Sequence, residues 1–306
     1  MKYLLSVILL VTLCRCTENT STTMPFSYNK YGHIIIPIKV SDTIINFVFD
    51  TGSSMSSISN EQKPSKLKLT DSCIKIIVLS MMDTCIAKIS EPVKIKFNNS
   101  LSQTDAKFAV FDTINDQLFS LIGMDVIKDF FWHFDFVNKA VTISTELLSV
   151  PEKSERLYYT MFDNKTRVSS AFYMLRVNDS TFFSIMDTGY AVNHIEYDSD
   201  STKNIVADTN VILYYMVKDE DDIGKFAKRI HKSEPKKYYS YYQMEFDTLK
   251  MNQFINTNKV IGVWSHPKLP QAYDNRLFIT LNFFKQFDQM YIDPKQTVVY
   301  LSNFEK

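Results

Sequence analysis

Glycine is scarce in this chain, which has only six in 306 residues. When glycine is this rare, each one marks a place where the backbone needs a residue without a side chain. The same scarcity excludes a glycine-rich phosphate-binding loop, and the sequence has no Gly-x-Ser-x-Gly elbow of the serine hydrolases. Nucleotide-dependent chemistry and serine hydrolysis are therefore not indicated.

Metal-ligand patterns and net charge are also lacking. The five histidines carry no metal-ligand spacing, so we expect neither a metal nor a cofactor; they are His33, His133, His194, His231 and His266. Basic and acidic residues number 34 each, so no net field favours nucleic acid as a partner. These absences leave chemistry that ordinary side chains can perform.

Long apolar runs are missing except at the start of the chain. A short positive segment, Met1–Tyr3, precedes a ten-residue apolar run that is too short to span a bilayer. This pattern predicts a secretory signal peptide over residues 1–16 and export to the periplasm, the cell envelope or the extracellular space. A lipid anchor on Cys14 or Cys16 is the less favoured alternative, because neither cysteine follows a small residue. The sequence also leaves open whether a removable pro-segment follows the signal peptide.

The triplet Asp-Thr-Gly occurs twice, at residues 50–52 and 187–189, each time after a strand-like apolar run. A single copy would indicate only a turn, since Asp and Gly are favoured there. Two copies have a further meaning if they face each other. Two adjacent carboxyl groups cannot both ionise readily, so they share a proton, and one is ready to act as a base and the other as an acid.

The segments before the two triplets resemble each other. A shift of 137 residues places Ile38–Thr43 on Leu175–Ser180 and carries both copies without a gap into their triplets. In each copy a short polar turn separates two apolar runs. This pattern predicts a β-hairpin whose second strand ends at the aspartate.

A second match lies downstream, where Leu121–Phe130 resembles Phe278–Phe287, with Thr280 in place of Gly123. A rival is Gly262, which lies at nearly the same distance from its triplet as Gly123 does from the first. The sequence leaves both alternatives open. Either way, the internal duplication fixes the architecture as two copies of one unit.

Composition is consistent with this duplication. Hydrophobic residues make up 45% of the chain, enough for one or two cores, and no long amphipathic helix stands out. We therefore expect a mostly β protein with an N-terminal lobe at residues 17–150 and a C-terminal lobe at residues 151–306. Because one chain holds both halves, a monomer is expected rather than a homodimer.

The segments Phe47–Ser53 and Leu121–Ile127 resemble the signatures of aspartic peptidases of the retropepsin and pepsin type. The nearest likeness is to bacterial retropepsin-like proteins in which two lobes are fused, and it covers nearly all of the mature chain. The resemblance implies an all-β fold of two pseudo-symmetric barrel lobes with a central cleft. It also implies an aspartic endopeptidase with Asp50 and Asp187 as catalytic residues and a peptide or protein as substrate.

The resemblance implies a role for each neighbour of the two aspartates. Thr51 and Thr188 are expected to hydrogen-bond across the lobe boundary and hold the carboxyl groups coplanar. Gly52 and Gly189 are expected to let backbone N–H groups approach the carboxylates. A water between the aspartates would attack the peptide carbonyl while one aspartate accepts and the other donates a proton.

The residue after each glycine differs between the copies. Ser53 follows the first glycine, and its hydroxyl is expected to bond an outer carboxylate oxygen. Tyr190 takes this position in the second copy and is too long to do the same. Tyr190 therefore favours an alternative, a catalytically silent, protease-like module of the cell envelope that binds peptides or partner proteins.

Two predictions concern the segment that follows the first triplet. Ile74–Ile89, with Leu79–Asp83 at its tip, is the candidate for a hairpin that covers the substrate; an ordinary surface hairpin is the alternative. Cys73 and Cys85 flank the tip, and an exported chain permits a disulfide between them if the hairpin turns near Leu79. Two free thiols are the alternative.

Overall fold

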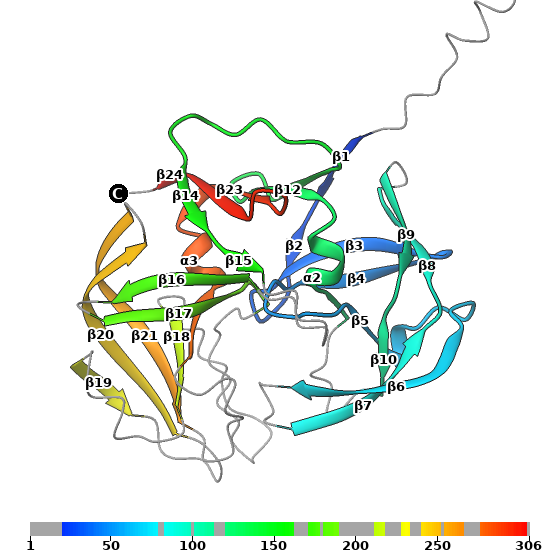
Figure 1. Ribbon diagram of the computed structural model, residues 1–306, viewed down its shortest axis with the longest axis horizontal. Coiled ribbons are helices and arrows are strands. Elements are labelled where there is room, and N and C mark those ends of the chain that lie inside the picture. The colour runs from blue at the N-terminus through cyan, green and yellow to red at the C-terminus, as the bar shows by residue number, and fades with distance from the viewer. Residues whose placement is uncertain are drawn as a thin grey trace, which may run out of the picture.

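The computed structural model in Figure 1 describes residues 20–78, 83–98, 101–112, 120–161, 171–177, 180–189, 211–217, 228–232, 240–251, 254–265 and 276–304. The protein is predominantly β, as the sequence predicts. Within these ranges the helical elements are short, namely η1 (Asn60–Gln62), α2 (Met124–Ile127) and α3 (Leu281–Phe284). The predicted signal peptide, with Cys14 and Cys16, and also Tyr190 lie outside the described residues.

A six-stranded antiparallel sheet contains strands from both halves of the chain (Figure 1). Its order is β1 (Ser21–Pro25), β13 (Ala140–Ser144), β12 (Phe131–Asp135), β23 (Phe287–Asp293), β24 (Val298–Phe304) and β14 (Glu155–Tyr158). The first three strands precede residue 150 and the last three follow it. The halves therefore meet where β12 pairs with β23.

The second sheet is built from residues of the first half. Its order is β6 (Leu69–Val78), β7 (Asp83–Ser90), β10 (Ala109–Phe111), β5 (Ser57–Ser59), β11 (Leu121–Ile122), β4 (Thr43–Phe49), β3 (Ile34–Val40), β8 (Val93–Phe97) and β9 (Leu101–Ala106), and β2 (Ser27–Tyr28) also pairs with β3.

The third sheet is built from residues of the second half. Its order is β15 (Thr160–Met161), β16 (Ala171–Val177), β17 (Ser180–Asp187), β22 (Arg276–Thr280), β18 (Val211–Val217), β21 (Phe254–Ser265), β20 (Ser240–Met251) and β19 (Lys228–Lys232), with a short extra pairing of β16 with β20.

The predicted barrels are not closed in the described part of the chain. The second sheet ends at β6 and β9, and the third ends at β15 and β19, with no ladder that joins the two ends of either sheet. In the first half, the β6–β7 hairpin forms one edge and the β8–β9 hairpin forms the other. Each outermost strand therefore pairs only with its neighbour in the sequence. Closure depends on contacts between distant strands, which hairpin patterns do not encode.

Both hairpins predicted before the triplets are present. The β3–β4 hairpin turns between Val40 and Thr43, with Ser41 in the left-handed region at φ 56°. The β16–β17 hairpin turns between Val177 and Ser180. Each second strand continues to its aspartate, so local pattern alone was sufficient to place these elements.

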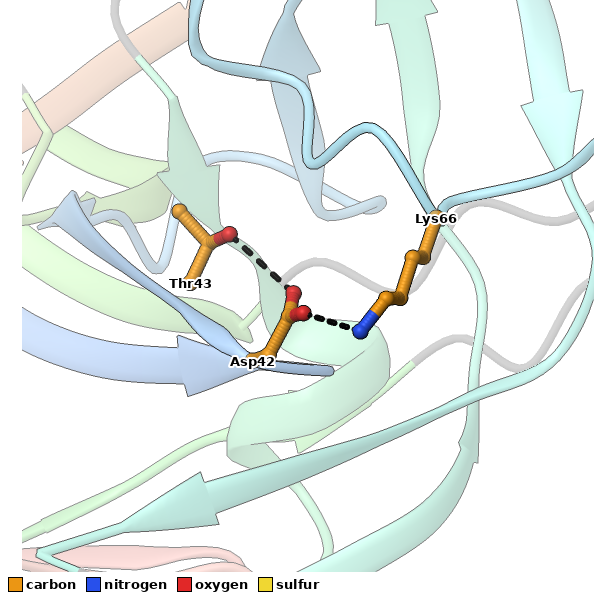
Figure 2. A network of polar contacts seen from close by, with 3 residues as sticks. All are labelled: Asp42, Thr43 and Lys66. Carbon is orange, nitrogen blue, oxygen red and sulfur yellow. Dashed lines mark hydrogen bonds and ion pairs between the residues drawn. The ribbon is translucent and has the colours of Figure 1, made fainter.

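Figure 2 shows how the turn of the first hairpin is tied to a neighbouring loop. The Nζ of Lys66 lies 2.5 Å from the Oδ2 of Asp42, and the hydroxyl of Thr43 donates to the Oδ1 of Asp42 at 3.4 Å. The side chains of Lys66 and Asp42 are 72% and 49% exposed. Exposed ion pairs contribute little to stability because water screens them. This turn is therefore a suitable place for a control substitution.

One hydrophobic core runs beneath both triplets and joins the two halves. It contains Ile34, Phe49 and Trp132 from the first half and Phe283 from the second, all fully buried. The ring of Phe49, one residue before Asp50, lies 4.9 Å from that of Trp132. Burial of a large apolar side chain contributes about 1.5–3 kcal/mol, so the strand that carries Asp50 is anchored firmly.

The disulfide predicted between Cys73 and Cys85 is wrong, because neither cysteine forms a disulfide. The register of the β6–β7 hairpin places Cys73 opposite Lys88 and Cys85 opposite Ile76. Residues three apart on a strand point to opposite faces, so the two sulfur atoms are directed away from each other. The hairpin turns later than a direct Cys73–Cys85 pairing requires.

Candidate active site

The first Asp-Thr-Gly triplet lies where β4 emerges between two neighbours. β4 pairs with β3 on one side and, in parallel, with β11 on the other, where Ile122 lies beside Phe49. The backbone N–H of Asp50 then donates to the carbonyl of Ile122 at 3.0 Å. Asp50 is thus held at the end of a strand that is supported on both sides.

The second triplet has the same local arrangement. β17 pairs with β16 on one side and, in parallel, with β22 on the other, where Asp187 lies beside Thr280. The short helix α3 follows Thr280 directly, as α2 follows Gly123. Gly262 lies elsewhere, in β21 opposite Tyr214. Of the two rivals left open by the sequence, Thr280 is therefore the counterpart of Gly123.

Gly123 is required by close packing under the first loop. A Cβ atom on Gly123 would lie 2.8 Å from the carbonyl oxygen of Ser53 and 2.8 Å from the carbonyl carbon of Met55. The next residue, Met124, donates its N–H to that same Ser53 oxygen at 2.8 Å. The chain after Asp50 therefore rests directly on the start of α2, and only glycine fits there.

The hydrogen bonds predicted between Thr51 and Thr188 are present. The N–H of Thr51 donates to the hydroxyl oxygen of Thr188, and the N–H of Thr188 donates to the hydroxyl oxygen of Thr51, both at 3.1 Å. The Thr51 hydroxyl donates to the carbonyl of Met186 and the Thr188 hydroxyl to that of Phe49, both at 3.0 Å. Each threonine thus binds the backbone of the opposite half.

The two carboxyl groups face each other. A Cβ on Gly52 would lie 2.6 Å from the Cγ of Asp187, and a Cβ on Gly189 would collide with the Cγ of Asp50. The carboxyl of Asp187 hydrogen-bonds to that of Asp50. Each aspartate keeps some exposure as a whole residue, but protein atoms enclose the carboxyl of Asp50, and the threonines are fully buried. The structure thus brings together two residues that are 137 positions apart.

Backbone N–H groups surround the carboxyl of Asp50. The N–H groups of Gly52 and Ser53 donate to its Oδ1 at 2.8 and 3.1 Å, and the backbone of Gly189 also hydrogen-bonds to it. These donors favour the ionised form, yet burial outweighs them and raises the pKa of Asp50. A raised pKa beside a second carboxyl favours retention of one shared proton by the pair.

The predicted role of the Ser53 side chain is wrong. Its hydroxyl donates to the carbonyl of Met55 at 2.9 Å, and it is the backbone N–H of Ser53 that bonds Asp50. The Ser53 and Met55 backbone packs on Gly123, and the Ser53 hydroxyl bonds within this loop.

Asp125 holds this loop through Ser56, a role that sequence reasoning missed. Its Oδ1 accepts the N–H of Ser56 at 2.8 Å and the hydroxyl of Ser56 at 2.7 Å, while the Ser56 oxygen accepts the N–H of Gly123 at 3.0 Å. Burial raises the pKa of Asp125 to about 6. Its position two residues after a scarce glycine is the signal that would have identified it.

The candidate covering hairpin is present in part. β6 and β7 pair antiparallel over Leu69–Val78 and Asp83–Ser90, and the tip between them lies outside the described residues. In the view of Figure 1 the hairpin extends from the first half toward the second. Ile86 on β7 is 75% exposed.

Other kinds of site are not seen in the described part of the chain. No group of histidine, cysteine and carboxylate side chains is placed to hold a metal ion there. Within the same residues, no helix has the length and apolar character to cross a membrane. Neither the family models nor the curated proteins with which the sequence was compared match it.

Proposed function

We propose that this protein is an exported aspartic endopeptidase that hydrolyses peptide bonds with a water molecule activated between Asp50 and Asp187. The observation that carries the proposal is the facing of the two carboxyl groups: a Cβ on Gly52 would lie 2.6 Å from the Cγ of Asp187, and a Cβ on Gly189 would collide with the Cγ of Asp50. Paired carboxyls that share a proton supply a general base and a general acid at one point. This chemistry needs no metal and no cofactor.

The proposed mechanism gives each residue a separate task. The ionised carboxyl of the pair takes a proton from the water as the water attacks the peptide carbonyl. The protonated carboxyl donates to the carbonyl oxygen, and the tetrahedral intermediate then collapses with transfer of a proton to the leaving amine. No covalent enzyme intermediate forms. Thr51 and Thr188 keep the carboxyls in place, which lowers the reorganisation needed in the transition state.

We further propose that the halves are pseudo-symmetric retropepsin-like lobes with a substrate cleft between them. Matching strand orders support this proposal. β4 lies between β3 and β11 as β17 lies between β16 and β22. β5 pairs antiparallel with β11 and parallel with β10, as β18 does with β22 and β21. In this proposal the β6–β7 hairpin covers an extended peptide in the cleft.

The proposed setting is the periplasm, cell envelope or extracellular space, with a monomer as the working form. The apolar run near the N-terminus supports export. The substrate is a peptide or protein, and balanced charge gives no reason to expect nucleic acid.

A second candidate is a catalytically silent module that binds peptides in the same cleft. The Ser53 hydroxyl bonds Met55 and not the Asp50 carboxyl, so one side-chain donor that would favour ionisation is absent. Tyr190 follows the second triplet where the resemblance has a small residue. A binding module would retain peptide affinity without cleavage.

The deciding experiment incubates the purified mature protein with a mixed peptide library from pH 3 to 8. Asp50→Asn and Asp187→Asn each remove one carboxyl of the pair, and Asp42→Asn makes the same change at the exposed site of Figure 2. We expect cleavage by the wild type and Asp42→Asn only. Cleavage that persists in Asp50→Asn contradicts the proposal. Peptide binding without cleavage by the wild type supports the second candidate.

A further inference from the structure

A short loop before β3 carries a histidine toward the second triplet. The Oδ1 of Asn29 accepts the backbone N–H groups of Tyr31 and His33 at 2.9 and 3.0 Å. The N–H of Gly32 donates to the carbonyl of Asn29 at 2.9 Å, and Gly32 has a φ of 85° that favours glycine. Hydrogen bonds within the loop therefore fix the backbone that carries the His33 ring.

These bonds fix the proton of the His33 ring. Because the Oδ1 of Asn29 accepts two backbone N–H groups, its Nδ2 is the donor side of the amide. That Nδ2 lies 3.0 Å from the Nδ1 of His33, which must then accept. In a neutral imidazole the proton is therefore on Nε2, where the ring is a donor.

The His33 ring hydrogen-bonds to the backbone of Gly189, in the second triplet. The ring donates, so the acceptor is the Gly189 carbonyl. Gly189 also hydrogen-bonds through its backbone to the carboxyl of Asp50, for which its N–H is the donor. One glycine thus connects His33 with the carboxyl pair.

Lys285 joins the same loop from the second half. It directly follows α3 at the C-cap, and its Nζ donates to the carbonyl of Gly32 at 3.0 Å and lies 4.2 Å from the centre of the Tyr28 ring. α3 itself begins after Thr280, the neighbour of Asp187. The loop is thus bound to the second half through Gly189 and through Lys285.

We propose that His33 is a positioning residue that holds the Gly189 carbonyl and so keeps the Gly189 N–H directed at the carboxyl of Asp50. This role rests on the proposed peptidase function. The arrangement of the second triplet is then stabilised in part by a residue of the first half that lies outside both triplets. In this proposal the effect of His33 on the reaction passes through Gly189.

Three variants separate the hydrogen bond from the packing of the ring. His33→Gln keeps an N–H donor near the position of Nε2, and His33→Phe keeps a ring without a donor. His133→Phe is the matched control, because His133 stacks on Tyr291 in the six-stranded sheet. Thermal denaturation checks that each variant is folded. If His33→Phe does not fold, Asn29→Ala takes its place, since it frees the ring to adopt the other tautomer.

The first measurement is NMR and needs no catalysis. Nitrogen-15 shifts of His33 at pH 7 are expected to show a bare Nδ1 and a protonated Nε2. Carbon-13 titration of the carboxyl pair is expected to show a pKa about 0.5–1 unit higher in His33→Phe, because loss of an N–H donor disfavours the ionised form. His33→Gln and His133→Phe are expected to titrate like the wild type. Identical titrations in all four proteins would overturn the proposal.

The second measurement is kinetic. We expect kcat to fall about tenfold in His33→Phe with KM changed less than about twofold, since misplacement affects the transition state more than binding. His33→Gln is expected to restore most of kcat. An equal loss in His33→Gln and His33→Phe would mean that only packing matters. If the wild type cleaves no peptide, the proposed function fails, while the NMR titration still decides the role of His33.

Discussion

Thr51 and Thr188 exchange identical hydrogen bonds, each receiving the other's backbone N–H on its hydroxyl oxygen at 3.1 Å. Both residues are almost fully buried. The two bonds join chain segments from opposite halves and stand directly behind the carboxyl pair. A change in either threonine therefore affects both loops.

Replacement of a threonine by valine is expected to destabilise the protein. Thr51→Val keeps the shape and removes the hydroxyl, so the N–H of Thr188 loses its partner in a buried place. An orphaned buried donor costs about 1–3 kcal/mol. Urea denaturation is expected to show this loss in Thr51→Val and in Thr188→Val, with Thr51→Ser close to the wild type. Equal stability of Thr51→Val and Thr51→Ser would contradict this interpretation.

Asp50→Asn is expected to stabilise the protein at neutral pH while it abolishes hydrolysis. Burial raises the folded-state pKa of Asp50, so its stabilising contribution is complete below the unfolded pKa and is lost as pH rises through the folded value. The charged form is thus the costly one at pH 7, and asparagine avoids that cost.

Thermal denaturation of Asp50→Asn and wild type at pH 4 and pH 7 tests this point. The gain in Tm is expected to be larger at pH 7 than at pH 4. Asp42→Asn, at an exposed position, is the control and should change Tm little at either pH. A lower Tm for Asp50→Asn at pH 7 would show that the pair is stabilising there.

The lowered pKa of His33 predicts that the folded protein loses stability as the pH becomes acidic. Burial, and then the nearby charge of Lys285, lower its pKa to about 4 from an ordinary 6.5. The unfolded chain therefore takes up a proton between these values while the folded chain does not, so stability falls as pH drops from 6.5 to 4. His33→Gln should flatten this part of the Tm profile. An unchanged slope between pH 6.5 and 4 would contradict it.

The raised pKa of Asp125 predicts the opposite dependence of stability on pH over nearly the same pH range. Burial raises its pKa to about 6, so its contribution to stability falls as pH rises from about 4 to 6. In Asp125→Asn the amide oxygen still accepts from Ser56. This variant is expected to be about 1–3 kcal/mol more stable than the wild type at pH 7, as measured by urea denaturation. Equal stability at pH 7 would mean that Asp125 ionises without cost.

The absence of a disulfide between Cys73 and Cys85 gives a simple chemical test. Because the hairpin register separates Cys73 from Cys85, a reducing agent should leave the Tm of the mature protein unchanged. Thiol titration under native conditions should find exposed Cys73 reactive. A Tm that drops on reduction would require a different register of β6 and β7.

The parts of the fold that were predictable are those with a local cause. The β3–β4 and β16–β17 hairpins follow from alternating residues around a short polar turn, and their repetition brought Asp50 and Asp187 into one hypothesis. The Cys73–Cys85 pairing failed because Cys73 lies opposite Lys88, three residues beyond Cys85 (88 − 85), and an odd shift of register moves a side chain to the other face. Turn position within a long hairpin is weakly marked in sequence.

What the sequence could not supply depends on contacts between distant residues. The direction of the Ser53 hydroxyl is set by a loop that packs on Gly123, which lies 70 residues away. His33 is an isolated histidine in the sequence and gains meaning only beside Gly189. Open sheets in place of barrels likewise reflect pairings of remote strands.

The six-stranded sheet has a consequence for how the chain could be divided. Each half supplies three adjacent strands, and the halves join through the antiparallel ladder of β12 with β23. The covalent connection near residue 150 raises the effective concentration of one half around the other, and the ladder supplies the contact itself. Two separately expressed fragments, cut at that connection, therefore carry complementary edges through which they can reassemble into a complete carboxyl pair.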